Sequence, residues 1–232
     1  AMQMVAAAKL RRAQEAAEQS RPYTSRFNAV MGGLAASVGG SGSAPKLLSG
    51  TGSDAVQLMV VMTSERGLCG GFNSNIVKKA KAHANALKAA GKTVKILTVG
   101  KKGRDQMKRE YGDLFVGHVD LTEVKRVGYT DAQGIAKDVL TRFDAGEFDI
   151  ATLFYAKFVN VVSQTPTAQQ IIPASFEVDE DATETTLYDY EPSEEAILAD
   201  LLPRGVATSI FSALLENGAS EQGARMSAMD NA

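Results

Sequence analysis

A glycine-rich turn at residues 64–75 has the residue types that come nearest to a binding site. It reads SERGLCGGFNSN, and it lies between the apolar run VQLMVVMT and a helix-like stretch. Such a turn can hold a phosphate, because backbone N–H groups meet the positive end of a helix dipole there. The alternatives are a tight turn that needs glycine for its backbone angles, and a recognition loop that offers Arg66 and backbone amides to an acidic partner.

The turn does not carry the motifs of a nucleotide site. Its glycines, Gly67, Gly70 and Gly71, form neither G-x-x-x-x-G-K-[ST] nor G-x-G-x-x-G. The next predicted strand ends in TVGKK, where a dinucleotide site has an acidic residue for the ribose. We therefore expect no nucleotide cofactor.

Cys69 is the only cysteine, so it has no internal disulfide partner, which fits a reducing compartment. A turn before a helix lowers the pKa of a thiol, but no sequence signature links Cys69 to either histidine, His83 or His118, as a base. These three residues form no spaced metal cluster, and the acidic residues of 177–200 do not follow the calcium-loop pattern. We expect no catalytic residue, no metal and no cofactor.

Charge is unevenly distributed along the chain, although the net charge is only −2. Residues 78–109 hold eleven Lys or Arg and one acid, whereas residues 177–200 hold ten acids and no Lys or Arg. Such runs are typical of solvated faces, and they also mark surfaces that meet charged partners. The basic stretch lacks interleaved aromatic residues, so we expect no nucleic-acid partner.

Residues 1–38 have the pattern of one long helix with a narrow seam. The spacing alternates steps of four and three, as in a coiled coil, and Pro22 is expected to bend the helix. At about 1.5 Å per residue the helix is far longer than a small domain, so it needs a partner helix or a surrounding protein. The seam consists of Met2, Ala6, Leu10, Ala13, Ala17, Ser20, Thr24, Phe27, Met31, Leu34 and Val38.

Residues 39–54 are rich in Gly and Ser and are predicted to be a flexible linker. Alternating strand and helix patterns follow, with Asn73 or Ser74 as a plausible N-cap. The repeated units predict an α/β fold with a Rossmann-like, mostly parallel sheet over residues 55–192. The expected strands are AVQLMVVMT, TVKILTV, DLFVGHV, FDIATLFYAKF and NVVSQTPTAQQIIP.

Residues 193–232 return to a helical pattern that starts well at Ser193 and is expected to kink or restart at Pro203. Small residues in both terminal helices would let their backbones approach closely. No apolar run approaches 18 residues, and the first residues do not have the order of a signal peptide, so we expect neither a membrane span nor a leader.

Four motifs in the same order along the whole chain resemble the gamma subunits of rotary ATP synthases. They are AMQMVAAAKLRRAQ with RPY, SERGLCGGFNSN, YDYEP and SEQGARMSAMDNA. The resemblance implies an antiparallel coiled coil of the terminal helices on the Rossmann-like domain, with both ends of the shaft cut short. It implies a non-catalytic rotor that couples rotation of the membrane c-ring to conformational change in the hexamer of alpha and beta subunits. A Rossmann-type enzyme and a coiled-coil scaffold remain as alternatives.

The resemblance also implies contact sites. The glycine turn of the family faces acidic beta residues, and a foot contacts the epsilon subunit (delta in mitochondria) and the c-ring. The subunit would be peripheral to the bacterial inner membrane on its cytoplasmic face, or less favoured, on the matrix side in mitochondria. The residues expected to contact the alpha and beta subunits are Lys9, Arg11, Arg12, Arg66, Gly67 and Cys69, and those expected at the foot are Tyr188, Asp189, Tyr190 and Glu191.

Overall fold

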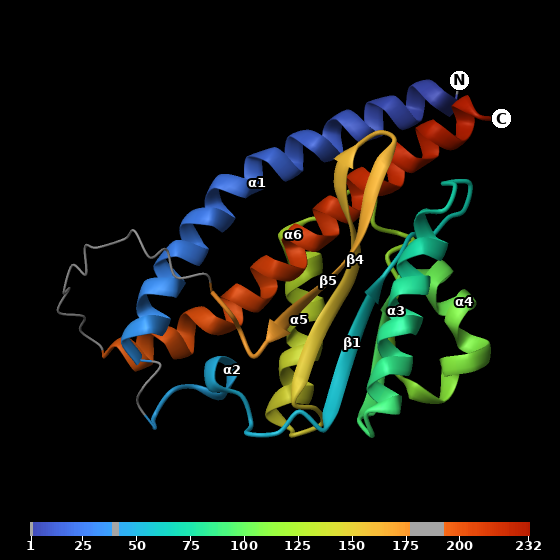
Figure 1. Ribbon diagram of the computed structural model, residues 1–232. Helices are drawn as coiled ribbons and strands as arrows, with labels where there is room; N and C mark the ends of the chain where they lie inside the picture. Colours follow the sequence, from blue (N-terminus) through green and yellow to red (C-terminus); the bar gives the residue numbers. More distant parts are fainter. Residues whose placement is uncertain (1, 39–41, 177–192) are drawn as a thin grey trace.

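Two long helices and a sheet domain make up the computed structural model, which describes residues 2–38, 42–176 and 193–232. Helices α1 (Met2–Val38) and α6 (Glu194–Asp230) lie side by side, and the sheet with its other helices packs against α6 (Figure 1). The predicted fold class, a mostly parallel sheet with two long terminal helices, is confirmed.

Helices α1 and α6 run antiparallel over their full length. At one end Gln3 donates a hydrogen bond to Asp230, and at the other end Ser37 donates one to Glu194. Both chain termini therefore lie at the same end of the molecule, as Figure 1 shows.

The predicted seam of α1 faces α6. All of its residues are buried or half-buried except Met2, which is 64% exposed on the first turn. Neither proline interrupts its helix: α1 is continuous through Pro22, and α6 continues through Pro203 without restarting. In α6, burial of the neighbouring Leu202 and Val206 holds the helical path despite the missing backbone hydrogen bond.

Within residues 42–176, the sheet has five strands in the order β3-β2-β1-β4-β5. Strands β1 to β4 run parallel to one another, and β5 returns from β4 as an antiparallel hairpin. The expected strands are all present, as β1 (Val56–Met62), β2 (Thr93–Val99), β3 (Phe115–Val119), β4 (Ile150–Asn160) and β5 (Ser163–Ile172).

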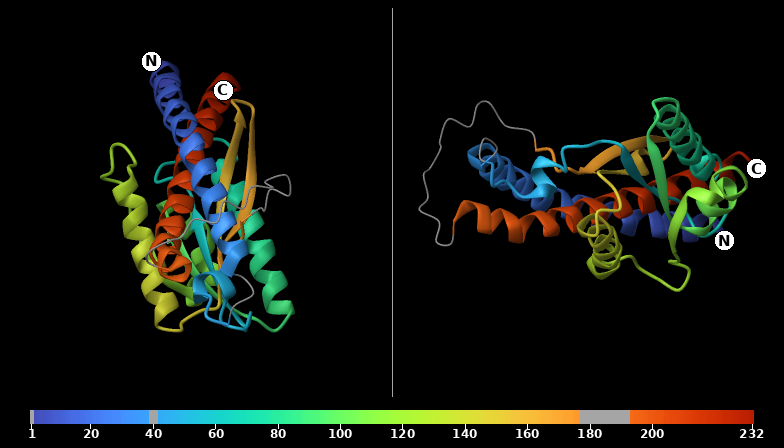
Figure 2. Two further views of the ribbon diagram at one scale, coloured as in Figure 1. Left: turned by 90° about the vertical axis from the view of Figure 1, so that its left-hand side faces the viewer. Right: turned by 90° about the horizontal axis from the view of Figure 1, so that it is seen from below.

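Helices cover both faces of the sheet (Figure 2). The alternation along β1 decides which side chains meet which layer: Met59 and Val61 pack under α3 and α4, whereas Leu58, Val60 and Met62 pack under α5 and α6. The bounds are α3 (Phe72–Ala89), α4 (Lys101–Tyr111), the short 3-10 helix η1 (Gly112–Leu114) and α5 (Tyr129–Asp144).

The predicted linker is only partly a linker. Residues 39–41 lie outside the described part, but Lys46–Ser49 form a short helix, α2. The backbone of Leu47 accepts a hydrogen bond from Ala174 N at 2.7 Å, and Leu47 and Leu48 pack on the cluster at the start of α6. Two leucines within a Gly/Ser-rich stretch are enough to attach this segment to the core.

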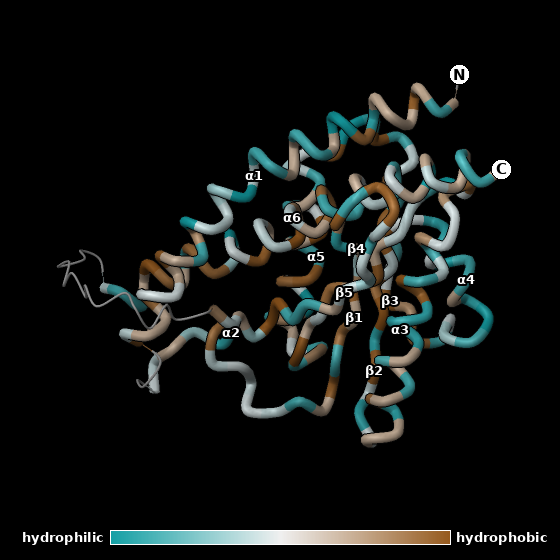
Figure 3. The backbone as a smooth tube through the Cα atoms, turned by 45° about the horizontal axis from the view of Figure 1, so that its top comes forward, coloured by the Kyte–Doolittle hydropathy of each residue, from teal (hydrophilic) through white to brown (hydrophobic). Residues whose placement is uncertain are grey.

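By length and composition alone, helix α6 is long and apolar enough to cross a membrane. The lack of a long uninterrupted apolar run therefore does not by itself exclude a membrane span. In the structure α6 packs against α1, α5 and β4, and its buried apolar residues belong to the core. Figure 3 shows how hydropathy is distributed along the backbone. The helix is the centre of the protein rather than one of its outer elements.

Candidate functional site

The carboxyl ends of the parallel strands are where an open α/β sheet binds ligands, at the point where the strand order reverses. Here that point lies between β1 and β4, because β2 and β3 follow on one side of β1 and β4 lies on the other. The glycine turn leaves β1 at this edge and extends toward the end of α6 (Figure 1).

Helix α6 fills the crevice at the switch point. The Asn217 side chain is 7% exposed; its Oδ1 accepts a hydrogen bond from Ala156 N at 3.0 Å, and its Nδ2 donates one to Met62 O at 3.2 Å. One side chain thus joins the ends of β1 and β4 where a ligand would otherwise lie.

A carboxylate of the chain occupies the amino end of α4. Glu65 accepts hydrogen bonds from Lys101 N at 3.1 Å, from Leu121 N at 2.9 Å and from the Thr122 hydroxyl at 3.3 Å. A helix amino end favours an anion, and Glu65 supplies it from within the protein. The same edge is tightly closed, since a Cβ on Gly100 would lie 2.1 Å from Thr63 O.

The segment is a tight turn, as one of the alternatives predicted. Of its three glycines, however, only Gly70 has the positive φ that favours glycine. Gly70 has a φ of +56°, whereas Gly71 has a φ of −84°. Leu68 also adopts the left-handed conformation, with a φ of 61°, and its side chain is 77% exposed. The turn therefore presents an apolar side chain beside Arg66 at its surface.

The turn is tied to α6 by Arg225. Its Nη1 donates to Gly67 O at 2.6 Å, and its Nη2 pairs with Glu221 at 2.5 Å. Burial raises the pKa of the Glu221 carboxyl, and the charges of Arg225 and Lys9 work against that rise. Through Arg225 the turn is hydrogen-bonded to the part of α6 around Glu221, which lies near Lys9 of α1.

Cys69 lies underneath the turn, at 2% exposure, so its side chain supports the loop and does not itself face a partner. Asn73 Nδ2 donates to its sulfur at 3.3 Å, and burial raises the pKa of the thiol, which is opposite to the activation of a nucleophile. The expected caps are wrong: α3 begins at Phe72 with Gly71 as N-cap, because Asn73 uses its Oδ1 to accept from Ser64 N.

The histidines do not complete a catalytic or metal site. His83 lies edge-on to Phe154 with ring centroids 5.0 Å apart, and His118 Nδ1 lies 2.7 Å from the Thr98 hydroxyl. The described residues contain no group of three or more His, Cys, Asp or Glu side chains that could hold a metal ion.

The residues predicted to contact partners fall into two groups. Lys9, Arg11 and Arg12 are exposed on α1, and Arg66 is exposed on the turn, all toward the end of the molecule that carries the termini. Arg11 also pairs with Glu15 at 3.4 Å, both of them exposed. The expected foot residues, Tyr188, Asp189, Tyr190 and Glu191, lie outside the described residues.

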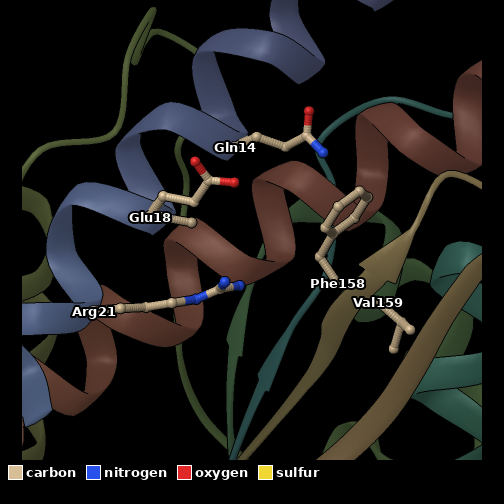
Figure 4. A pocket seen from close by; sticks show the side chains of 6 residues that line it. Gln14, Glu18, Arg21, Phe158 and Val159 are labelled. Carbon is tan, nitrogen blue, oxygen red and sulfur yellow. The ribbon is translucent and has the colours of Figure 1, made fainter.

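Small grooves lie between α1 and the β4–β5 hairpin. One encloses about 190 Å³ and is lined from α1 by Gln14, Ala17, Glu18 and Arg21, and from β4 by Phe158 and Val159 (Figure 4). Ligand pockets for drug-sized molecules usually enclose about 300–1,000 Å³, so this groove is too small for a nucleotide. The adjacent groove, of about 450 Å³, shares Arg21 and includes no residue of the glycine turn.

Comparison with known proteins gives one consistent result. The family model described as ATP synthase matches residues 1–232. The chain is 83% identical to the ATP synthase gamma chain of Roseobacter denitrificans and 78% identical to that of Ruegeria sp., in each case over all of this chain and 80% of the relative.

Solved structures agree at the level of the fold. The central stalk and c-ring structure of the Tetrahymena thermophila mitochondrial ATP synthase contains a chain that is 27% identical, with a TM-score of 0.75 over 99% of this chain and 96% of that one. A rotor chain of the Euglena gracilis mitochondrial ATP synthase shares the fold at a TM-score of 0.55 and 17% identity, over 99% of this chain and 90% of that one.

Proposed function

The chain belongs to the ATP synthase gamma-chain family, which forms the central stalk of the enzyme, and we propose that it acts there as a non-catalytic rotor subunit. In this role, rotation of the membrane c-ring turns the paired helices α1 and α6 within the hexamer of alpha and beta subunits. The asymmetric shaft then sets the catalytic sites of the hexamer to different conformations.

The filled switch point is the observation that carries the non-catalytic part of this proposal. Asn217 occupies the crevice between β1 and β4, and Glu65 occupies the amino end of α4. A Rossmann-type enzyme uses the switch-point crevice for its ligand. In this proposal the sheet domain supports the paired helices and binds no ligand. The scaffold alternative makes the same prediction, whereas the enzyme alternative requires an open ligand site.

The exposed basic residues near the chain termini are proposed to contact acidic residues of the alpha and beta ring. Arg66 and the α1 residues Lys9, Arg11 and Arg12 present their charges at that end. Gly67 contributes through its backbone, and Cys69 contributes by supporting the turn. Exposed ion pairs are each worth roughly 0–1 kcal/mol, which suits contacts that must break at every step of rotation.

The opposite end of the molecule is proposed as the foot, which would contact the epsilon subunit (delta in mitochondria) and the c-ring. Phe176 and the first turns of α6 pack with the end of α1 there. We place Tyr188, Asp189, Tyr190 and Glu191 at this contact.

Crosslinking tests the orientation. A Tyr188→Cys variant carrying a photoreactive crosslinker should couple to epsilon or c in the assembled complex. Crosslinks to beta would reverse the proposed direction of the shaft. Because the relatives are bacterial, we place the subunit at the cytoplasmic face of the inner membrane, peripheral to it through the complex.

Affinity purification tests the function itself. The tagged chain, purified from detergent-solubilised membranes, should bring with it alpha, beta, epsilon and c subunits and an ATPase activity. A chain that purifies without alpha and beta subunits would be a scaffold protein and would overturn the rotor proposal.

A further inference from the structure

Strand β4 continues beyond the end of its parallel neighbour. The last paired residues of β1 and β4 are Val61 and Phe154, yet β4 extends to Asn160 as one arm of the hairpin. The backbone groups of residues 156–158 that face the β1 side are thus left without a strand to bond.

Side chains of α6 take the place of that missing strand. Asn217 accepts from Ala156 N, the Ser220 hydroxyl donates to Ala156 O at 2.7 Å, and Glu216 accepts from Phe158 N at 3.0 Å. Ser220 has no exposed surface, so its hydrogen bond cannot be replaced by water.

The contact continues along one stripe of α6. A Cβ on Gly223 would lie 3.1 Å from the Phe158 ring, so glycine is what lets the hairpin lie against the helix, and the Ser227 hydroxyl donates to Val161 O at 2.8 Å. The residues of this stripe recur at helical spacing, which puts them on one face of α6. We call Glu216, Asn217, Ser220, Gly223 and Ser227 the hairpin seam.

The hairpin seam is also connected to the other helix of the shaft. Arg21 of α1 donates to Glu216 at 3.0 Å, while the second oxygen of Glu216 holds Phe158 N. Figure 4 shows Arg21 extending from α1 toward α6, with Phe158 on the far side of the groove. In the described residues α1 packs mainly on α6 and makes no extended contact with the sheet, so force between α1 and the sheet passes through α6.

We propose that the hairpin seam is the mechanical connection through which the shaft and the sheet domain turn together, with Asn217 and Ser220 as its positioning residues. This inference rests on the proposed rotor function. It assigns to α6 a second role besides pairing with α1, and it predicts that weakening the seam lets the hairpin and the shaft slip relative to each other under load.

The test uses complete ATP synthase carrying Ser220→Ala in this chain, with Ser209→Ala as the matched control on the same helix outside the hairpin seam. In Ser220→Ala, hydrogen exchange at residues 156–158 should rise about tenfold, the effect of losing one buried hydrogen bond. ATP hydrolysis should stay within about twofold of the unmodified complex, while protons pumped per ATP should fall. Ser209→Ala should change none of these three quantities.

Unchanged exchange at residues 156–158, or raised exchange with pumping equal to that of the control, would overturn the proposal. If Ser220→Ala does not assemble, the less buried Ser227→Ala gives the same readouts at residues 161–162. Failure of the proposed function has a different signature, because the unmodified chain would then not copurify with alpha and beta subunits at all.

Discussion

Arg66 illustrates at the residue scale how a contact can matter for coupling without mattering for folding. Its side chain is exposed on a turn that Arg225 holds from beneath, so replacing Arg66 removes no internal hydrogen bond of that side chain in the described structure. We therefore expect Arg66→Glu to change the free energy of unfolding by less than about 0.5 kcal/mol.

The same substitution should impair transmission. A glutamate facing acidic residues of beta at about 4 Å is repelled by on the order of 4 kcal/mol at an effective dielectric of 20, and by less where water enters. The complex should assemble, and ATP-driven pumping should fall more than ATP hydrolysis. The defect should shrink as salt rises, because the screening length shortens to about 3 Å at 1 M. An unchanged ratio of pumping to hydrolysis at low salt would remove Arg66 from the proposed contact.

The two histidines give the sheet domain a defined response to acid. Burial lowers the pKa of His83, as does the charge of Lys79, and burial is likewise the main cause of the lowered pKa of His118. Between these lowered values and the ordinary 6.5, the unfolded chain binds more protons than the folded one. Stability from these groups is therefore complete above pH about 6.5 and is lost as the pH falls toward the folded-state pKa.

Urea unfolding of the chain at pH 7.5 and at pH 5.5 measures this effect. The unmodified chain should lose stability at the lower pH, and a His83→Gln, His118→Gln variant should lose less. Burial raises the pKa of Glu221, so this residue stabilises the folded chain as the pH falls, which is opposite to the effect of the histidines. The difference between the losses of the two proteins therefore isolates the contribution of the histidines. Equal losses in both proteins would assign the acid sensitivity to other groups.

Residue roles within the turn show where sequence reasoning stops. The motif test found no nucleotide signature in the turn, but it did not show that Leu68 takes a positive φ or that Asn73 bonds Ser64 in place of capping α3. The conformation around Leu68 depends on a contact between segments, since Arg225, far away in the chain, donates to the carbonyls of Gly67 and Leu68. The Asn73 bond depends on how the turn itself folds back on Ser64. Short-range patterns do not contain that information.

At the element scale, periodicity was informative where one helix face meets one partner. The four-three spacing of α1 identified the residues that face α6, because α1 has a single buried side. Helix α6 packs on α1, on α5 and on the hairpin at once, so its buried residues follow no single stripe. The signal that remained was a set of polar residues, Glu216, Asn217 and Ser220, within an apolar helix; such buried polar groups need partners.

The asymmetry between the two helices changes what we expect for their ends. Their small residues alone predict that residues 1–20 and residues 215–232 are both poorly ordered in the isolated chain, since such seams bury little apolar area. The structure separates them, because α6 is bonded to β4 and Val161 up to Ser227, whereas the early part of α1 packs on α6 alone.

Hydrogen exchange of the isolated chain checks this. Amides of residues 2–20 should exchange fast, because little apolar area holds them, whereas amides of residues 215–227 should approach the protection of the sheet. Fast exchange over both segments would show that the hairpin seam does not hold α6 without the ring.

At the scale of the whole molecule, the alternation of strands and helices was enough to predict the fold class, since parallel strands buried on both faces leave continuous apolar runs such as VQLMVVM. The antiparallel pairing of α1 and α6 came from the family resemblance, because a seam of small residues does not by itself identify its partner. What neither source contained is that α6 passes over the carboxyl ends of β1 and β4. Because of that placement, the edge of the sheet where related folds bind ligands is used here to hold α6.

This placement leads to a prediction about the whole chain: it should bind neither ATP nor NAD at sub-millimolar concentrations. A nucleotide at the switch point would have to displace Asn217 from Met62 O and Ala156 N, and leave these buried backbone groups to find new partners. Each buried group left unpaired costs about 1–3 kcal/mol, and a phosphate at α4 would in addition have to displace the Glu65 carboxylate.

Equilibrium dialysis of the isolated chain against labelled ATP and NAD measures the affinity, with Asn217→Ala as the comparison protein in which the crevice is emptied. Saturable binding to the unmodified chain, protecting residues 64–75 from hydrogen exchange, would mean that α6 leaves the crevice readily. The sheet domain would then have to be regarded as a nucleotide-binding domain that the shaft regulates.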